Sequence, residues 1–298
     1  MNTLKQIDSK IPISIAYSPD TDDAFMVLAL REKRVDWGNF EFSFTIGDIQ
    51  ELNDAAKQDK YDITAISVSA YPHIQKNYLL MPIGASVGDG FGPAIVIAPN
   101  RQVSLANLRH GRIAVPGLST TAHIAAQTVL GPFEPVPMHF MDIKHAVLSG
   151  SVDAGILIHE LQLDPTSEGL HKLADLGQLW HEHFKRPLPL GANAIKRSLG
   201  TETISQLSAV YLESIELGLT ERAKTIASAV RTAVARDSLN EEKGDKYISM
   251  YVNERSLRFD DDVVDGIELI YKNGFKLGFL PQTTVRDNLS GSGKGTSQ

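Results

Sequence analysis

The apolar positions in the first seventy residues follow two periods that alternate along the chain. Ile11–Tyr17 is a nearly continuous apolar run, typical of a buried strand, whereas Ala24–Glu32 has the apolar spacing of a helix. Phe40–Thr45 alternates like a second strand, Ile49–Lys57 has helical spacing, and Tyr61–Ser67 resembles a third strand. Strands joined through helices normally lie parallel, so this order predicts an α/β fold with a mostly parallel sheet.

The middle of the chain repeats this alternation without repeating its sequence. Leu79–Ser86 and Ala94–Ala98 are expected to form a strand pair separated by the glycine-rich loop Gly88–Pro93. Beyond them we expect strands at Arg112–Val115, Met138–Phe140 and Ala154–Ile158 and helices at Ala122–Leu130 and Ile143–Ser149. A second α/β unit therefore follows the first.

The last third of the chain is predicted to be chiefly helical, after a proline-rich break at Pro187–Gly191. The expected helices are Thr203–Asp237, Glu241–Val252 and Asp261–Asn273. Ser290–Gln298 lacks apolar anchors, so we expect it to be disordered.

Length and composition agree with two domains. The 298 residues, 42% of them hydrophobic and 22% charged, are enough for two medium domains that each bury a core. We place one domain at residues 1–98 and 190–298 and a second, inserted domain at residues 99–189. This arrangement predicts a cleft between the two domains.

Several classes of protein are disfavoured by what the chain lacks. Apolar runs such as Ile83–Val87 are far shorter than the roughly 20 residues that cross a bilayer, so no membrane partner is expected. Residues 1–10 have no signal-peptide features. The absence of cysteine excludes disulfides, thiolate metal sites and cysteine nucleophiles. These features together favour a cytoplasmic protein.

Charge points to a small ligand rather than to nucleic acid. The net charge of −7 argues against nucleic-acid binding, which usually requires a basic stripe on the surface. A small anion can still bind, because helix ends and a few local groups decide that binding.

Candidate binding groups lie in loops that follow predicted strands, since ligands of open parallel sheets gather at the carboxyl ends of strands. The loops are Ser18–Asp23, Ser67–Tyr71 and Ser119–Thr121. Thr120 and Thr121 precede a predicted helix, where hydroxyls and unpaired N–H groups can hold a carboxylate. Simple N-capping explains the same residues, and spacing alone favours it.

The acidic residues Asp22 and Asp23 allow two interpretations. They can act in catalysis or metal binding, or they can complement the dipole of the helix that follows them. Their spacing favours the second interpretation, as it does for the acidic run Asp260–Asp262.

His159 directly follows the apolar strand Ala154–Ile158, at the edge where the cleft should open. Histidine is the commonest general base, although a bond to nearby backbone explains the same position. His181 and His183 are two residues apart in a helical context and so do not form a metal pair. The loop Gly88–Pro93 matches no nucleotide fingerprint and is better interpreted as a lid or a hinge.

Six segments in order resemble the 1,4-dihydroxy-6-naphthoate synthase family. They are Ser18–Phe25 (SPDTDDAF), Asp62–Tyr71 (DITAISVSAY), Gly88–Pro93 (GDGFGP), Thr120–His123 (TTAH), Val152–Glu160 (VDAGILIHE) and Leu188–Gly191 (LPLG). The resemblance implies a type 2 periplasmic-binding-protein fold acting in the futalosine route to menaquinone. It also implies cleavage of cyclic dehypoxanthine futalosine, a small carboxylated substrate, without a redox cofactor or a metal.

The resemblance further implies roles for individual residues. His159 would be the proton acceptor that starts the elimination. The residues implied to bind substrate are Asn53, Ala65, Ile66, Ser67, Thr120, Thr121, Ala122 and Asp23. Two of them, Thr120 and Asp23, can instead shape their loops.

The first loop departs from the family pattern, because many members carry Cys-Pro-Asn where this chain has Asp20-Thr21-Asp22. Two alternatives stay open: chorismate dehydratase, a sister enzyme of similar fold, and a non-catalytic intracellular protein that captures a carboxylate by domain closure. The Thr120–His123 and Val152–Glu160 segments favour the synthase over the dehydratase.

Overall fold

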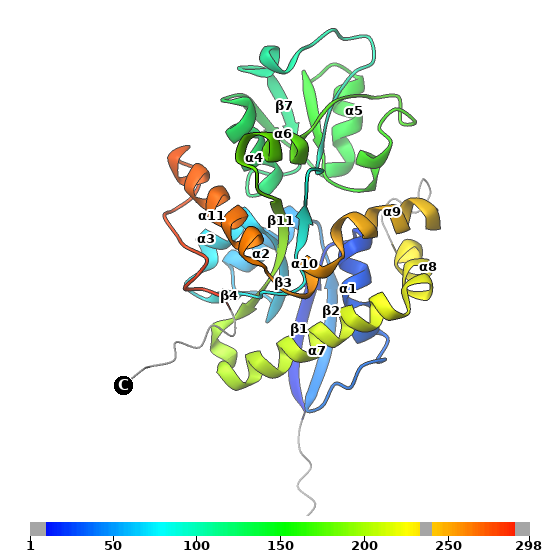
Figure 1. The fold of residues 1–298 in the computed structure, drawn as a ribbon, viewed down its shortest axis with the longest axis vertical. Helices are drawn as coiled ribbons and strands as arrows, with labels where there is room; N and C mark the ends of the chain where they lie inside the picture. The colour runs from blue at the N-terminus through cyan, green and yellow to red at the C-terminus, as the bar shows by residue number, and fades with distance from the viewer. Residues whose placement is uncertain (1–9, 233–239, 290–298) are drawn as a thin grey trace, which may run out of the picture.

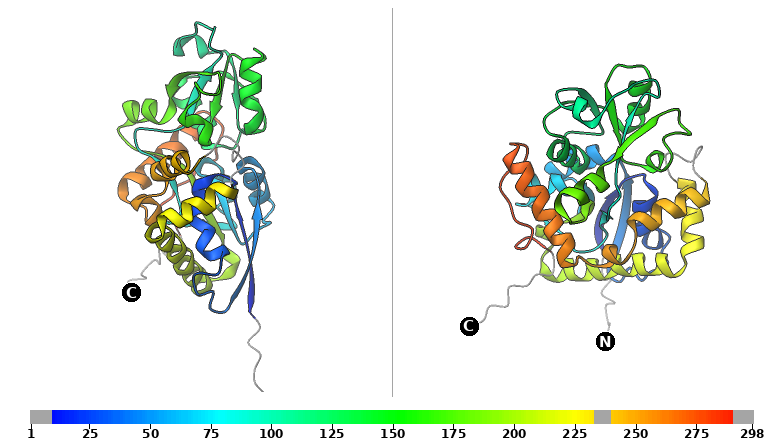
Figure 2. Two further views of the ribbon diagram at one scale, coloured as in Figure 1. Left: turned by 90° about the vertical axis from the view of Figure 1, so that its right-hand side faces the viewer. Right: turned by 45° about the horizontal axis from the view of Figure 1, so that its top comes forward.

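The chain folds around two β-sheets that lie at opposite ends of its long axis (Figures 1 and 2). We describe a computed structural model, covering residues 10–232 and 240–289. The first sheet has the order β2-β1-β3-β11-β4, with β5 paired to β11. Its strands are β1 (Ile11–Tyr17), β2 (Phe40–Ile46), β3 (Ile63–Ser67), β4 (Tyr78–Leu80), β5 (Ser86–Gly88) and β11 (Leu188–Lys196).

The second sheet has the order β10-β6-β9-β7-β8. Within it β7 is parallel to β8 and β9, whereas β6 is antiparallel to β9 and β10. Its strands are β6 (Ala94–Ile97), β7 (Arg112–Val115), β8 (Glu134–Pro137), β9 (Ala154–Leu157) and β10 (His171–Asp175).

Helices cover both sheets. With the second sheet lie α4 (Thr121–Leu130), α5 (Ile143–Leu148) and α6 (Leu176–Phe184). With the first lie α1 (Thr21–Arg31), α2 (Ile49–Lys57), α3 (Tyr71–Ile74), α7 (Thr201–Thr220), α8 (Arg222–Thr232), α9 (Glu241–Tyr251), α10 (Glu254–Leu257) and α11 (Asp261–Lys276). We call the first sheet with its helices the first lobe and the second sheet with its helices the second lobe.

The predicted β-α-β-α-β start is confirmed. β1 lies between β2 and β3 and is parallel to both, with α1 and α2 as the crossovers. The apolar run of β1 is explained by burial, since Ile13 and Ile15 are each 1% exposed. β11, which comes from far along the chain, joins β3 antiparallel, so the first sheet is mixed rather than parallel throughout.

Three sequence predictions in other regions are corrected. The strand expected at Met138–Phe140 lies earlier, at Glu134–Pro137, because that register pairs it with β7 and an edge strand tolerates proline. The helix expected at Thr203–Asp237 is divided at Glu221 into α7 and α8, and its end lies outside the described residues, as does the tail 290–298.

The expected strand pair 79–86 and 94–98 is also wrong. β4 and β5 join the first sheet and β6 joins the second, because the intervening loop carries the chain from one lobe to the other instead of reversing it. The chain returns at residues 185–187, and β11 then pairs with β5, with Leu188 opposite Gly88. The domain limits expected at 98/99 and 189/190 stay a prediction.

The first crossing packs backbone against backbone on the start of α6. A Cβ placed on Gly177 would lie 1.9 Å from the carbonyl oxygen of Phe91, and one placed on Gly92 would lie 2.8 Å from the amide nitrogen of Gly177. Glycine is therefore required at these positions to let the two segments touch.

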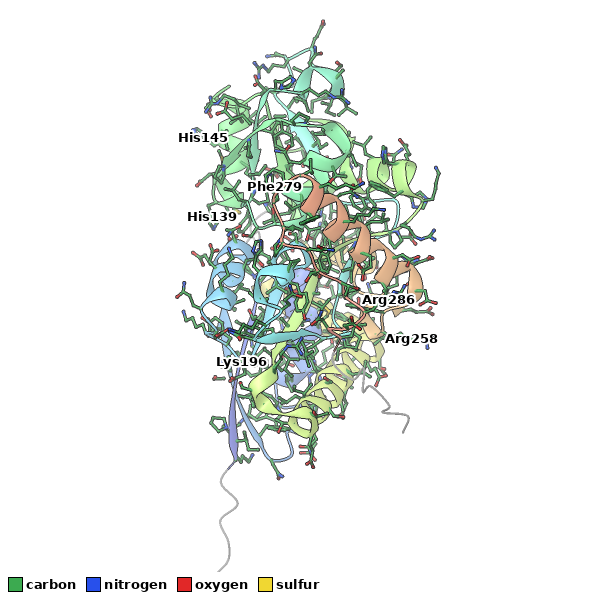
Figure 3. The ribbon with its side chains drawn as sticks, turned by 90° about the vertical axis from the view of Figure 1, so that its left-hand side faces the viewer. His139, His145, Lys196, Arg258, Phe279 and Arg286 are labelled. Atoms are coloured by element: carbon green, nitrogen blue, oxygen red, sulfur yellow. The ribbon has the colours of Figure 1, made fainter. Side chains whose placement is uncertain are left out.

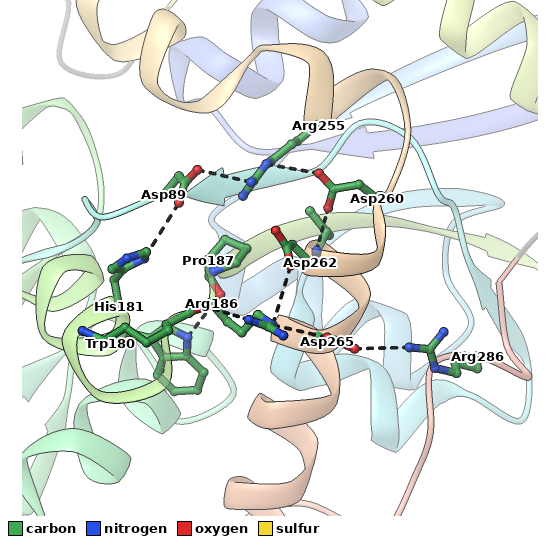
Figure 4. A network of polar contacts seen from close by, with 12 residues as sticks. Asp89, Trp180, His181, Arg186, Pro187, Arg255, Asp260, Asp262, Asp265 and Arg286 are labelled. Carbon is green, nitrogen blue, oxygen red and sulfur yellow. Dashed lines mark hydrogen bonds and ion pairs between the residues drawn. The ribbon is translucent and has the colours of Figure 1, made fainter.

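An ion-pair network ties the crossings to α10 and α11 (Figure 4). Arg255 lies 3.2 Å from Asp89 in the first crossing and 3.4 Å from Asp260, while Arg186 in the second crossing lies 3.3 Å from Asp265. Each of these pairs is partly exposed, so each contributes on the order of 1 kcal/mol or less. Their effect is to orient the crossings rather than to hold the fold together.

The lobes also share a core away from the crossings. One buried cluster includes Ile66 of the first sheet, Ile113 of the second and Ile267 of α11. The C-terminal end of α11 leads to the second lobe, where Phe279 lies (Figure 3). The ring of Phe279 is 5.1 Å from that of His123. The lobes are therefore in contact along one side.

Candidate active site

A cavity lies between the lobes, at the carboxyl ends of β1, β3 and β9. Its volume is about 570 Å³, including the part that is open to solvent. The first lobe lines it with Ser18, Asp20, Asp22, Asp23, Ile49, Ser67, Ser86, Leu190, Gly191, Tyr247 and Tyr251. The second lobe lines it with Pro93, Thr120, Thr121, Ala122 and Ile158. The lobes are closed around this cavity, because the Tyr247 hydroxyl of the first lobe is hydrogen-bonded to the Ile158 carbonyl of the second.

Thr120 caps α4, as the sequence predicts. Its hydroxyl oxygen accepts a bond from the His123 N–H at 3.4 Å, and the hydroxyl donates to the Gly117 carbonyl at 2.7 Å. Both functions of the Thr120 hydroxyl are thus occupied within the protein.

The Thr121 hydroxyl is occupied in the same way. It donates to the Leu190 carbonyl at 2.8 Å and accepts from the Ser69 N–H at 3.1 Å. The backbone N–H groups of Thr121 and Ala122, at the positive end of α4, have no hydrogen-bond partner among the described residues. This end of the cavity is suited to an anion held by backbone donors.

Ser67 lies at the end of β3 and lines the cavity, and Asn53 fixes its orientation. The Asn53 side chain, which is 0% exposed, donates to the Ser67 hydroxyl at 3.1 Å and accepts from the Ser67 N–H at 2.8 Å. Ala65 and Ile66 pair with β11 and do not line the cavity. Asn53, Ala65 and Ile66 are therefore placed behind the cavity wall, and Ser67 forms the wall.

The opposite end of the cavity is acidic. Asp20, Asp22 and Asp23 line it, and no Lys, Arg or His does so within residues 10–232 and 240–289. Asp23 Oδ2 accepts from the Ser18 N–H at 3.0 Å, and Asp22 Oδ2 accepts from the Ser86 hydroxyl at 2.6 Å. Asp20 holds the N-cap position of α1 without a side-chain cap bond, whereas Asp22 and Asp23 lie in the first turn of α1, where acidic groups complement the helix dipole as their spacing predicts.

Burial raises the pKa of each of these acids. It raises the pKa of Asp23 to about 7, and the neighbouring Asp22 adds to the effect. Burial also raises the pKa of Asp22, against the hydrogen bond from Ser86, and raises that of Asp20 well above its usual range together with repulsion from Glu160. A carboxyl group that holds its proton, as Asp23 does in part at pH 7, can both donate to and accept from the hydroxyl groups of a ligand.

His159 lies at the end of β9 and is 1% exposed. Its Nδ1 accepts from the Leu161 N–H at 3.3 Å, its ring packs on Phe140 with centroids 4.7 Å apart, and its buried Nε2 has no hydrogen-bond partner among the described residues. Burial, together with repulsion from His139, lowers the pKa of His159 to about 4. The imidazole is therefore neutral at pH 7, and the preceding residue, Ile158, lines the cavity in its place.

Two tyrosines that were not predicted from the sequence also line the cavity. Tyr247 and Tyr251 are four residues apart on α9 and line the cavity side by side, with ring centroids 4.9 Å apart. The Tyr247 hydroxyl donates to the Ile158 carbonyl at 2.9 Å and so links the lobes. The i, i+4 spacing within a predicted helix shows that the two rings share a face, but nothing in the sequence shows that this face meets the cleft.

Two negative findings complete the description. Across residues 10–232 and 240–289, no three His, Asp or Glu side chains converge in a way that could hold a metal ion. Within the same ranges no helix is both long and apolar enough to cross a membrane.

Two lobes, paired crossings and a ligand-sized cavity between them define a type 2 periplasmic-binding-protein fold. The alkanesulfonate-binding protein SsuA of Xanthomonas axonopodis pv. citri shares this fold at a TM-score of 0.71 and 15% identity, over 93% of this chain and 97% of that one. A Candida albicans protein, CA3427, described as having the generic periplasmic-binding-protein fold, matches at 0.72 and 12% identity, over 94% and 96%.

Sequence comparison narrows the class to a family. Residues 13–276 match the family model described as menaquinone biosynthesis. A 1,4-dihydroxy-6-naphthoate synthase of Streptomyces coelicolor is 32% identical over 90% of this chain and 95% of the relative, and one of Thermus thermophilus is 32% identical over 70% and 74%. The crystal structure of protein AF1704 from Archaeoglobus fulgidus matches at a TM-score of 0.83 and 37% identity, over 90% and 98%. The chain belongs to this family of menaquinone-biosynthesis enzymes.

Proposed function

We propose that this enzyme is a lyase that converts cyclic dehypoxanthine futalosine to 1,4-dihydroxy-6-naphthoate. The observation that carries the proposal is the opposite character of the two cavity ends. The backbone donors of Thr121 and Ala122, with the Ser67 hydroxyl, suit the carboxylate of the substrate. The acids of the Ser18–Asp23 loop, whose pKa values burial raises, suit hydroxyl groups of its sugar-derived part.

The same proposal assigns His159 as the proton acceptor. Its neutral imidazole and its unpartnered Nε2 agree with a general base. The closed cavity does not include the ring, so opening of the cleft and binding of substrate must bring Nε2 to the reacting carbon. A general base must lie within hydrogen-bond distance of the proton that it removes, as well as have a suitable pKa. The proposal therefore requires that Nε2 of His159 comes within this distance of the substrate.

The other proposed site residues are assigned roles according to whether they lie on the cavity wall or behind it. Ser67, Thr120, Thr121, Ala122 and Asp23 lie on the cavity wall and are proposed to contact substrate or to shape the wall. Asn53 is proposed to act through Ser67, which it orients with two hydrogen bonds. No redox cofactor is part of the proposal, and the cytoplasmic location stays a prediction.

The test is incubation of the purified protein with cyclic dehypoxanthine futalosine, followed by mass and absorbance of the naphthoate product. Product from the wild type but not from His159→Ala supports both the reaction and the base. Folded wild-type protein that gives no product contradicts the proposal. Chorismate is the second substrate to assay, and ligand-induced closure without product would indicate a binding protein.

A further inference from the structure

Glu160 makes an unusual contact across the closed cleft. It follows β9 in the second lobe and is 6% exposed. Its Oε1 accepts from the backbone N–H of Thr21 at 2.9 Å and from the Thr21 hydroxyl at 2.7 Å. Thr21 is the first residue of α1 in the first lobe and is itself completely buried.

This contact supplies what α1 lacks in its own sequence. Asp20, at the N-cap position, makes no side-chain cap bond, and the N–H of Thr21 belongs to the first turn, where helix donors need an outside acceptor. Glu160 provides that acceptor from a place 139 residues away. The cap is therefore complete when the lobes are closed and is lost when they separate.

The neighbours of Glu160 face the same way. The Ile158 carbonyl accepts from the Tyr247 hydroxyl at 2.9 Å, and the Gln162 side chain accepts from the Tyr251 hydroxyl at 3.4 Å. The segment that carries His159 is thus attached to the first lobe on both sides of Glu160. Moving Glu160 must move His159, because the two residues share a peptide bond.

We propose that Glu160 is a positioning residue that caps α1 across the cleft and thereby fixes the His159 segment in the closed enzyme. It does not line the cavity, and the proposal gives it no contact with substrate. Its effect on the reaction is through closure and through the placement of the adjacent histidine.

The first test needs no substrate. Small-angle scattering of the ligand-free protein compares Thr21→Val, which removes the hydroxyl donor at nearly constant volume, with the matched control Thr21→Ser, which keeps it. We expect a larger radius of gyration for Thr21→Val and for Glu160→Ala, and wild-type values for Thr21→Ser and for Glu160→Gln, which retains Oε1 as an acceptor. Circular dichroism confirms that each variant is folded. Equal radii in all the folded variants would overturn the proposal.

The second test is kinetic and rests on the proposed function. With cyclic dehypoxanthine futalosine, kcat/KM should fall roughly tenfold or more in Glu160→Ala, since a hydrogen bond to a charged group is worth about that factor. Thr21→Val should add little in the Glu160→Ala background, because both changes break one contact. Full additivity would contradict a shared contact. If the wild type is inactive while the scattering result holds, the proposed function fails and the cross-cleft cap survives.

Discussion

Replacing Asp23 by asparagine should stabilise the protein, and the gain should grow with pH. Asparagine has nearly the same shape and can still accept the Ser18 N–H bond that Asp23 Oδ2 accepts at 3.0 Å. It removes a carboxyl whose pKa burial raises from 3.8 to about 7 in the folded protein. The Asp23→Asn substitution therefore tests whether the acidic end of the cavity lowers the stability of the folded protein.

The sign of the effect follows from proton binding. Between pH 3.8 and about 7 the folded protein keeps the Asp23 proton that the unfolded chain has lost, so stability falls as pH rises through this range. The difference between about 7 and 3.8 is about 3 pKa units. At ~1.36 kcal/mol per unit, ionisation of Asp23 costs on the order of 4 kcal/mol at pH 8 and about 2 kcal/mol at pH 5.5. The advantage of the variant should therefore grow by about 2 kcal/mol between these two pH values.

The assay is urea unfolding of wild type and Asp23→Asn at pH 5.5 and pH 8, followed by both fluorescence and circular dichroism. Coincident transitions allow the two free energies of unfolding to be compared. A stability difference that is the same at both pH values would refute the reasoning, because it would mean that Asp23 titrates alike in the folded and unfolded chain.

Three further predictions concern single residues. His159→Ala should lower kcat by about 100-fold or more with the fold intact by circular dichroism, and near wild-type turnover would remove it as the base. Asn53→Ala leaves the buried Ser67 N–H without its acceptor, so a loss of about 1–3 kcal/mol in urea unfolding and a raised KM are expected, whereas an unchanged KM would separate Ser67 from substrate binding. Gly177→Ala places a methyl group against the Phe91 carbonyl and should cost about 3 kcal/mol, seen as a lower thermal midpoint, and unchanged stability would show that α6 can move away from the first crossing.

The spacing of apolar residues predicted the bounds of helices and strands well where that spacing follows from burial of one face of the element. β1, β7 and α2 begin and end where the apolar spacing places them, because one face of each is buried by its immediate neighbours in the fold. β5 and β6 failed as a pair because membership of a sheet depends on distant partners, here β11 and β9. No period within residues 79–98 carries that information.

In the candidate site, too, some residues could be predicted from local sequence patterns and others could not. Ser67, Thr120 and Thr121 were found because strand ends and helix starts are visible in the sequence. Ser86 and Tyr247 were missed because they reach the cavity through the fold of distant segments.

The acidic loop shows a different limit of sequence reasoning. Asp22 lies in the first turn of α1, as the dipole interpretation requires, but its burial against Ser86 could not be predicted because that contact arises only when the first lobe is assembled. Capping was correct at Asp260, where the helix begins in the open and its carboxylate accepts from the Val263 N–H at 2.8 Å.

The pairing of Gly88 with Leu188 places the two ends of the segment that forms the second lobe side by side in the first sheet. The chain leaves the first sheet and returns to it at facing positions of two antiparallel strands. A turn of about two residues is enough to join such positions as a hairpin, so residues 89–187 could be replaced without breaking any strand of the first sheet. By the same geometry, a relative's second lobe could be grafted between positions 88 and 188 to give a hybrid that inherits one cavity wall from each parent.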